Sequence, residues 1–177
     1  MSKSEKQLTF LSDDAQIENS LECSTRNDQI VKIYIDGAAR NNPGPAGAGI
    51  YIKRGDKILF EQGFFLGQKT NNQAEYLALI IGAFFIQEYA KKDESVLIYS
   101  DSQLLVRQMT GIYLVRDAIL KKMQQIATEL LRIYSVKFCH IYRQDNTQAD
   151  FLANRGIDKK VVIPKKIEDK IREYNII

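Results

Sequence analysis

The sequence predicts one α/β domain: a mixed five-stranded sheet, with three antiparallel strands and then parallel crossovers, flanked by helices. The order of the segments carries this prediction. Three strand-like segments follow one another before the first helical segment, as in an antiparallel meander. After them, strand-like and helical segments alternate, so the later strands can run parallel and be joined by crossovers. A length of 177 residues suits a single domain with modest tails.

Composition and charge fit a soluble protein without specifying a partner. Hydrophobic residues make up 45% of the chain, enough for one core, and the formal net charge is +3. This mildly basic balance permits a nucleic-acid partner without requiring one. Cys23 and Cys139 lack a metal-ligand spacing. The chain starts without the apolar core of a signal peptide, and the apolar run 77–86 is too short to span a bilayer. We therefore expect a cytoplasmic protein without membrane association.

The opening segments have strand spacing. Val31, Ile33 and Ile35 alternate with polar or aromatic residues. Residues 37–49 contain Asn-Pro and Pro-Gly pairs and are interpreted as turn-rich. Residues 50–66 then predict a hairpin with Arg-Gly-Asp at its tip, which completes the meander.

The next segment predicts a helix that ends near Ala90. Asn72 is a candidate cap, and Glu75 lies three residues further on, as in a capping box. Residues 96–101 form a short, continuously apolar strand, which favours an interior place in the sheet.

The second half continues the alternation. One helix is expected from residue 102 and a second over 117–132, followed by a strand over 136–143. A last helix begins near Asn146, a candidate cap, and Pro164 then interrupts the chain. We divide the chain into a flexible N-terminal tail (1–29), a catalytic domain (30–158) and a basic C-terminal extension with a short helix (159–177).

Four acidic residues are expected to meet at one edge of the sheet. Asp36 ends the first predicted strand and Asp101 ends the fourth. Glu75 and Asp150 lie in the first turns of the helices that follow the third and fifth strands. Ligands bind outside the carboxyl ends of strands in open α/β sheets, so the four side chains can converge there.

The chemistry of this set favours hard divalent cations. Carboxylates without His or Cys suit Mg²⁺, with Mn²⁺ as a substitute. Two such ions can stabilise the attacking and leaving oxygens of an in-line displacement at phosphorus. Singly, each acid has a simpler explanation as a strand-end charge or a helix N-terminal residue. Together they predict a metal-dependent site.

These acids lie within segments that resemble the type 1 ribonuclease H family. The matching segments within residues 30–158 are IYIDGAARNNPGPAGAGI, KTNNQAEYLALI, IYSDSQLLVRQ and NTQADFLANRG. The resemblance implies a ribonuclease H-like fold and a monomer that hydrolyses the RNA strand of RNA–DNA hybrids, leaving 3′-hydroxyl and 5′-phosphate ends. It also implies that the metal-binding catalytic residues are Asp36, Glu75, Asp101 and Asp150.

The resemblance further implies contacts with the substrate. Asn42 and Asn71 fall where the family contacts the RNA strand, and an amide can both donate to and accept from a 2′-hydroxyl. The backbone of Gly37 and the side chain of Gln103 are further candidates on the RNA side. Thr70 falls where the family contacts a phosphate of the DNA strand. The simpler alternative at Asn42 is turn chemistry.

Two departures from the family pattern matter. Many members carry a histidine in a loop before the last acid, whereas here that loop has none. His140 lies in the fifth predicted strand and is interpreted as structural. Arg143 is the better candidate for an assisting group, because a guanidinium stabilises phosphate charge; the alternative is an ordinary surface arginine.

The second departure concerns hybrid binding. Some relatives have a basic protrusion between the fourth and fifth strands, but this segment is short here and its nearest cations are Lys121 and Lys122. We therefore expect weak, salt-dependent binding, to which lysines of the C-terminal extension can add. Two alternatives stay open at this point: a nuclease of the same fold with another nucleic-acid substrate, and a non-catalytic hybrid-binding module.

Overall fold

The computed structural model describes residues 30–176, so the predicted tail over 1–29 lies outside the described part. The elements in chain order are β1 (Val31–Ala39), β2 (Gly44–Arg54), β3 (Lys57–Lys69), α2 (Asn71–Tyr89), β4 (Ser95–Ser100), α3 (Gln103–Met109), α4 (Ala118–Leu131), β5 (Ser135–His140), the short 3₁₀ helix η1 (Arg143–Asp145), α5 (Thr147–Lys159) and α6 (Lys165–Glu173).

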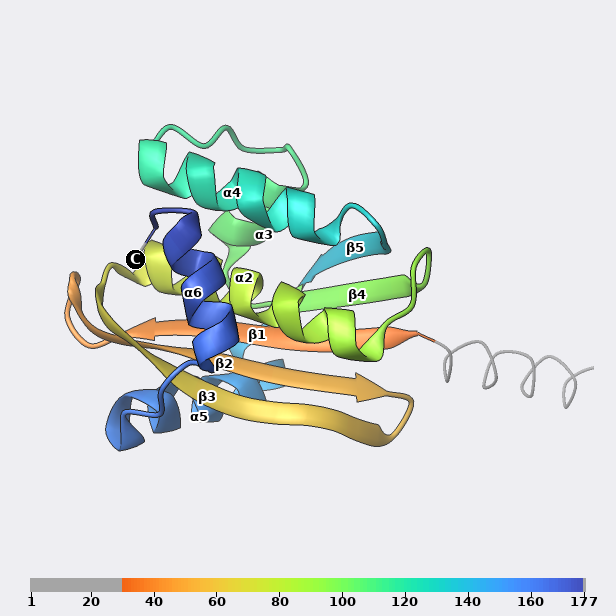
Figure 1. Cartoon of the computed structure of the whole chain (residues 1–177), viewed down its shortest axis with the longest axis horizontal. Helices are drawn as coiled ribbons and strands as arrows, with labels where there is room; N and C mark the ends of the chain where they lie inside the picture. The colour runs from red at the N-terminus through yellow and green to blue at the C-terminus, as the bar shows by residue number, and fades with distance from the viewer. Residues whose placement is uncertain (1–29, 177) are drawn as a thin grey trace, which may run out of the picture.

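The strands form one mixed sheet in the order β3-β2-β1-β4-β5 (Figure 1). β2 pairs antiparallel with both β1 and β3. β4 pairs parallel with β1 and with β5. This confirms the predicted meander followed by parallel crossovers, and it makes β4 an interior strand as its continuous apolar sequence predicts.

Helices cover the two faces of the sheet unequally. The view in Figure 1 has α2, α4 and α6 on one face and α5 on the other. The main core lies under the first group and includes fully buried residues such as Ile33 of β1, Leu77 of α2 and Met123 of α4. Since α2 lies between the sheet and α4, most of its length is apolar and buried. None of the helices within residues 30–176 has both the length and the hydropathy needed to cross a membrane.

The glycine-rich segment 37–49 is mostly strand, so the prediction of a turn there is wrong except over residues 40–43. The reason is close packing of α5 against the meander. A Cβ at Gly49 would lie 2.0 Å from the carbonyl oxygen of Ala149 in α5. Small residues are thus required by the helix that covers these strands, although the same residues in isolation are typical of turns.

Two predicted helix caps also differ from the structure. Thr70, not Asn72, caps α2: its side chain accepts from the Gln73 backbone N–H, and the Gln73 side chain accepts from the Thr70 backbone N–H. The Thr-x-x-Gln spacing satisfies the capping box two residues earlier than predicted. Asn146 occupies the N-cap position of α5, but its side chain makes no capping hydrogen bond.

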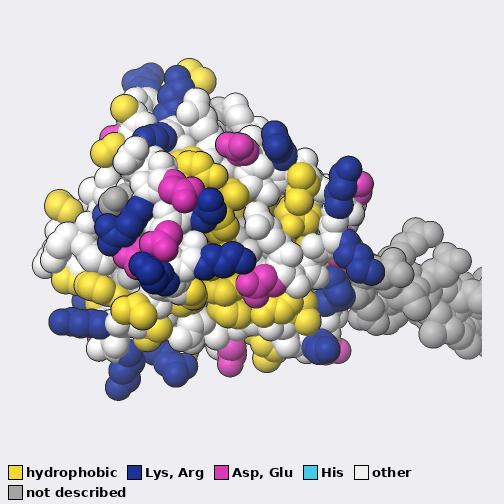
Figure 2. Space-filling model, in the orientation of Figure 1, with side chains coloured by type: hydrophobic (Ala, Val, Ile, Leu, Met, Phe, Trp, Pro, Cys, Tyr) yellow, Lys and Arg dark blue, Asp and Glu magenta, His cyan; other side chains and the backbone are white. Residues whose placement is uncertain are grey.

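The C-terminal segment contains a helix, α6, that packs onto the main core. Ile167 and Ile171 of α6 are buried, together with Ile163 before the helix and Ile176 after it. Figure 2 shows basic and acidic side chains interspersed on this face of the molecule. Within α6 itself, three ion pairs join opposite charges: Lys165–Asp169, Arg172–Glu168 and Lys170–Glu173. Because three of its basic side chains are paired with acids, the C-terminal segment presents less positive charge than its number of lysines suggests. The predicted domain boundary after Asp158 stays a prediction.

We predict that Ile171→Ala destabilises the whole domain. Ile171 is 0% exposed, and truncating a buried Ile to Ala costs roughly 2–5 kcal/mol. Urea unfolding followed by circular dichroism measures the change. The exposed Val162 offers a control, since Val162→Ala should lie within about 0.5 kcal/mol of the parent. Equal stability of the two variants would show that α6 is not an integral part of the fold.

Candidate active site

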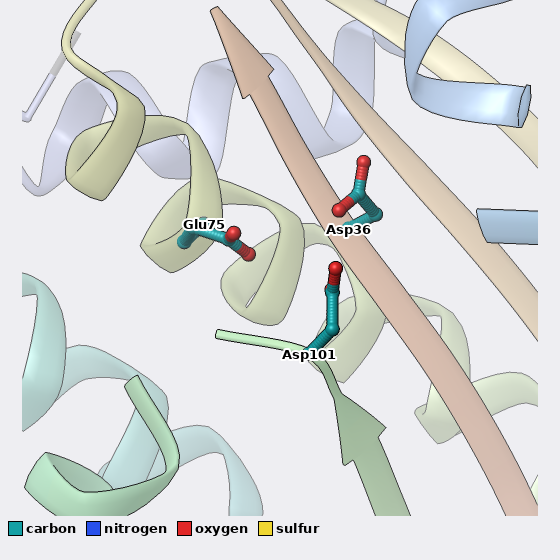
Figure 3. Close-up of side chains that lie close together, drawn as sticks. All are labelled: Asp36, Glu75 and Asp101. Carbon is teal, nitrogen blue, oxygen red and sulfur yellow. The ribbon is translucent and has the colours of Figure 1, made fainter. Parts of the chain in front are cut away.

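Three carboxylates meet where β1 and β4 run side by side (Figure 3). Asp36, Glu75 and Asp101 each offer an oxygen, and these oxygens lie within 4.8 Å of one another. Asp36 does not end β1 as predicted, because the strand continues to Ala39 through its pairing with β2, whereas Asp101 directly follows β4. Glu75 lies just past the first turn of α2 and not in it as predicted, because the helix begins at Asn71. The parallel pairing of β1 with β4 brings the first two acids together, as their positions in the sequence predict.

Gly37 allows the third acid to approach. Its backbone N–H donates to Glu75 Oε2 at 3.1 Å. A Cβ on Gly37 would lie 2.1 Å from the Glu75 backbone nitrogen, so a larger residue would push α2 away from β1. The N–H that was considered for substrate contact is therefore engaged by a candidate metal ligand, and a substrate role for Gly37 stays a prediction.

Asp150 lies on the rim of the same cleft, outside the group of three. It belongs to the first turn of α5, as predicted. Its Oδ1 lies 2.6 Å from a guanidinium nitrogen of Arg143, a side chain that is 78% exposed. Asn154, one helical turn further along α5, donates to the Asp150 carbonyl oxygen at 3.0 Å. The structure thus joins three of the predicted acids tightly and places the fourth beside them with a basic partner.

Burial and mutual repulsion disfavour ionisation of the two most enclosed acids. Burial, aided by the charges of Asp101 and Asp150, raises the pKa of Asp36 to about 7, against the lowering effect of Arg143. Burial and the charges of Asp36 and Asp101 raise the pKa of Glu75 well above its usual range, although the Gly37 N–H acts the other way. The positive charge of Arg143 is therefore too small to balance the effects that raise the pKa values of Asp36 and Glu75.

This donor set fits hard divalent cations. The three clustered acids supply only oxygen, and a cation among them would remove the repulsion that raises their pKa values. The cleft around them has a volume of about 400 Å³ and is lined mostly by polar groups. Among the predicted substrate residues, its lining includes Gly37, Asn71 and Arg143.

The asparagines of the predicted RNA contact lie together at the start of α2. Asn42 Oδ1 accepts from the Asn71 backbone N–H at 3.0 Å, and the Asn42–Pro43 peptide bond is cis. Thr70, next to Asn71, uses its side-chain oxygen to cap α2. The three residues are therefore tied to one helix terminus, which fixes them relative to Glu75 on the same helix.

Four candidates are outside the cleft lining: Asn42 and Thr70, described above, and Gln103 and His140. Gln103 is the exposed first residue of α3. His140 is the exposed last residue of β5 and makes an edge contact with the ring of Tyr142. His140 is absent from the cleft lining, its interpretation as a structural residue stays a prediction, and so does a role for Gln103.

The sequence interpretation missed several groups of the site. Arg40, Ser102 and Asn154 line the cleft. Asn154 follows Asp150 by four residues, so helical spacing could have identified it. Asn146 was interpreted only as a cap, but its side-chain nitrogen donates to Asp101 Oδ1 at 2.9 Å. No local pattern signals that contact, because it joins residues 45 positions apart.

Comparison of the sequence with known proteins shows consistent similarity. A family model described as reverse transcriptase-like matches residues 34–156, which contain all four acids. Ribonuclease HI of Halobacterium salinarum is 39% identical over 130 residues, which cover 72% of this chain and 64% of that protein. A bifunctional protein of Mycobacterium tuberculosis is 37% identical, and the match covers 72% of this chain but only 35% of the relative. A ribonuclease H of Paracidovorax citrulli is 31% identical over 73% of this chain and 95% of its own length. The chain thus spans less than two thirds of the first two relatives and nearly all of the third.

Solved structures give the same result. RNase H1 from Halobacterium salinarum superposes with a TM-score of 0.69 at 38% identity, covering 73% of this chain and 98% of that one. LC11-RNase H1, a protein isolated from compost, gives a TM-score of 0.69 at 39% identity, covering 73% of this chain and 97% of that one. The latter structure is a complex with an RNA/DNA hybrid.

We predict that the cation-free protein loses stability as the pH rises. Because the pKa of Asp36 is about 7 when folded against an ordinary 3.8, the folded state holds a proton more tightly than the unfolded state between these values. The free energy of unfolding therefore falls as the pH rises from about 4 through about 7, and the raised pKa of Glu75 adds to the fall in the same direction. Melting temperatures in chelator should decrease over this range, and MgCl₂ should raise them more at alkaline pH than at pH 4–5, because a larger share of the ligands is ionised there.

Asp36→Asn is the matched variant for this prediction. It removes one buried charge at constant size, so in chelator at pH 8.5 it should melt at a higher temperature than the parent and show a flatter pH dependence. Added MgCl₂ should stabilise it less than the parent. An unchanged pH dependence in this variant would contradict the assignment of the effect to Asp36.

Proposed function

The chain belongs to the type 1 ribonuclease H family, and we propose that it is an endonuclease that hydrolyses the RNA strand of RNA–DNA hybrids. The observation that carries this proposal is a group of three acids, two of them buried and the third half-buried, whose oxygens lie within 4.8 Å of one another, beside a fourth acid on the cleft rim. Such a cluster is costly to fold unless cations compensate it, so its presence supports a catalytic role over that of a binding module.

Asp36, Glu75 and Asp101 would hold the cations, and Asp150 would complete the ligand set from the rim. We propose Mg²⁺ as the working ion, with Mn²⁺ as a substitute, because all four groups are hard oxygen donors. Two bound ions would supply Lewis-acid activation of water and stabilisation of the leaving 3′ oxygen during in-line displacement, giving 3′-hydroxyl and 5′-phosphate ends.

The protein's own residues would bind and orient the substrate around this centre. Arg143 lies at the cleft mouth on an exposed, flexible side chain, where it can exchange its contact with Asp150 for one with a phosphate oxygen. The Asn42 and Asn71 amides would contact 2′-hydroxyl groups, which only the RNA strand offers. Gln103 would extend this contact along α3, and Gly37 would offer backbone groups at the cleft floor.

Thr70 would contact a phosphate of the DNA strand. Its oxygen accepts from the Gln73 N–H, but a hydroxyl also has a proton to donate. The related protein LC11-RNase H1 binds an RNA/DNA hybrid, which supports the same partner for this chain. We further propose that the protein acts as a monomer in the cytoplasm.

The first test compares nucleic-acid substrates. Labelled RNA–DNA hybrid, duplex RNA and duplex DNA are incubated with the full chain in MgCl₂, MnCl₂ or chelator. We expect cleavage confined to the RNA of the hybrid and dependent on the divalent ion. Hybrid binding without cleavage would favour a non-catalytic module, and cleavage of another duplex would favour a different nuclease.

The second test removes a charge from the acidic cluster. Asp101→Asn should lower kcat by roughly 100-fold or more, because a ligand charge at the cation site is lost while the side-chain volume is kept. Asp56→Asn, at the exposed turn between β2 and β3, is the matched control and should keep the parent kcat. Parent-like turnover in Asp101→Asn would exclude Asp101 from the active site.

A further inference from the structure

We infer that Asn146 is a positioning residue that holds together the elements bearing Asp36, Asp101 and Asp150. The inference rests on the proposed function, since it concerns the same acidic cluster. Asn146 lies between η1 and α5 and is 1% exposed. It therefore acts through the acids and has no direct access to a substrate.

Three hydrogen bonds connect Asn146 to the three elements. Its side-chain nitrogen donates to the Ile35 carbonyl oxygen at 3.0 Å, in the peptide unit that leads into Asp36. The same nitrogen donates to Asp101 Oδ1 at 2.9 Å. Its backbone carbonyl oxygen accepts from the Asp150 N–H at 3.1 Å. One buried residue thus contacts β1, the end of β4 and the first turn of α5.

The direction of the amide is fixed by its partners. Both side-chain contacts are acceptors, a backbone carbonyl and a carboxylate, so only the NH₂ group can face them. In this orientation Asn146 Oδ1 is buried and finds no hydrogen-bond partner within residues 30–176. The residue also makes no capping bond, although it occupies the N-cap position of α5. The side chain thus makes neither a helix-capping hydrogen bond nor a hydrogen bond through Oδ1. Its NH₂ group points at Asp101 and Ile35 instead.

An amide is suited to this task because it carries no charge. The bond to Oδ1 restricts rotation of the Asp101 carboxylate and leaves its other oxygen for a cation. A lysine or arginine at the same place would hold the carboxylate but would also neutralise it and compete with the cation. Asn146 orients the acid while the negative potential of the cluster is preserved, as partners behind metal ligands do elsewhere.

Gln108 provides the comparison for loss of a buried amide. It is 5% exposed, accepts from the Tyr76 hydroxyl at 2.9 Å and lies on α3, outside the cleft lining. Its removal should reduce stability without changing the acids. Asn146→Ala and Gln108→Ala can therefore be compared for effects on folding and on the cation site separately.

The experiment measures Mg²⁺ binding by isothermal titration calorimetry, melting temperature in chelator, and kcat and KM for hybrid cleavage, all on the full chain. For Asn146→Ala we expect the Mg²⁺ dissociation constant to rise and kcat to fall, each by about 10-fold or more. The hybrid KM should stay within about threefold of the parent, because Asn146 lies behind the acids. Gln108→Ala should lower the melting temperature with Mg²⁺ affinity and kcat unchanged.

A second variant guards against loss of folding. Asn146→Leu has a similar volume and cannot donate in any protonation state, so its kcat should fall by a similar factor while its circular dichroism stays that of the parent. Parent-like Mg²⁺ affinity in Asn146→Ala, parent-like kcat in Asn146→Leu, or equal loss of Mg²⁺ affinity in Gln108→Ala would overturn the inference. The Mg²⁺-binding measurement does not depend on whether the protein cleaves RNA–DNA hybrids. If the parent cleaves no hybrid yet its Mg²⁺ affinity depends on Asn146, the function is wrong and the positioning role holds.

Discussion

Electrostatic repulsion among buried carboxylates is the constraint on which the rest of this structure depends. Asp36 and Glu75 are 5% and 6% exposed, and they face Asp101 across less than 5 Å. Nothing in their own chemistry favours this arrangement without cations, so the remainder of the fold must hold it. Burial and this repulsion raise the pKa values of Asp36 and Glu75, so these side chains bind protons more tightly than free carboxyl groups do. Divalent ions that bind these carboxylates would displace the protons.

The packing of the domain explains how the acids are held. The parallel register of β1 and β4 sets the spacing of Asp36 and Asp101, and hydrophobic burial of α2 against the sheet keeps Glu75 in place. Gly37 removes the side chain that would otherwise separate α2 from β1. On the other face, close contact of α5 with the glycines of the meander brings Asp150 to the cleft rim. The same contacts that exclude water from the core thus determine the geometry of the cleft.

Much of this could be predicted from the sequence, because strand and helix periodicities depend on burial. The alternation in β1 indicated a strand and the apolar run of β4 indicated an interior one, and the predicted positions of Asp36 and Asp101 near the ends of these strands indicated a common edge. Local composition misled where tertiary packing dominates: the glycines of residues 37–49 predicted a turn but accommodate α5. The Asn72 cap was wrong because a better capping box starts at Thr70. The contact of Asn146 with Asp101 and the pairing of Arg143 with Asp150 depend on side-chain directions, which no sequence spacing specifies.

The central claim is that Asp36, Glu75 and Asp101 together hold a divalent cation. Anomalous X-ray diffraction from crystals of the full chain grown with MnCl₂ tests it most directly. The account predicts a manganese peak within coordination distance of oxygens from all three residues. A well-ordered cleft with no peak, or a peak whose ligands exclude two of these acids, would contradict it.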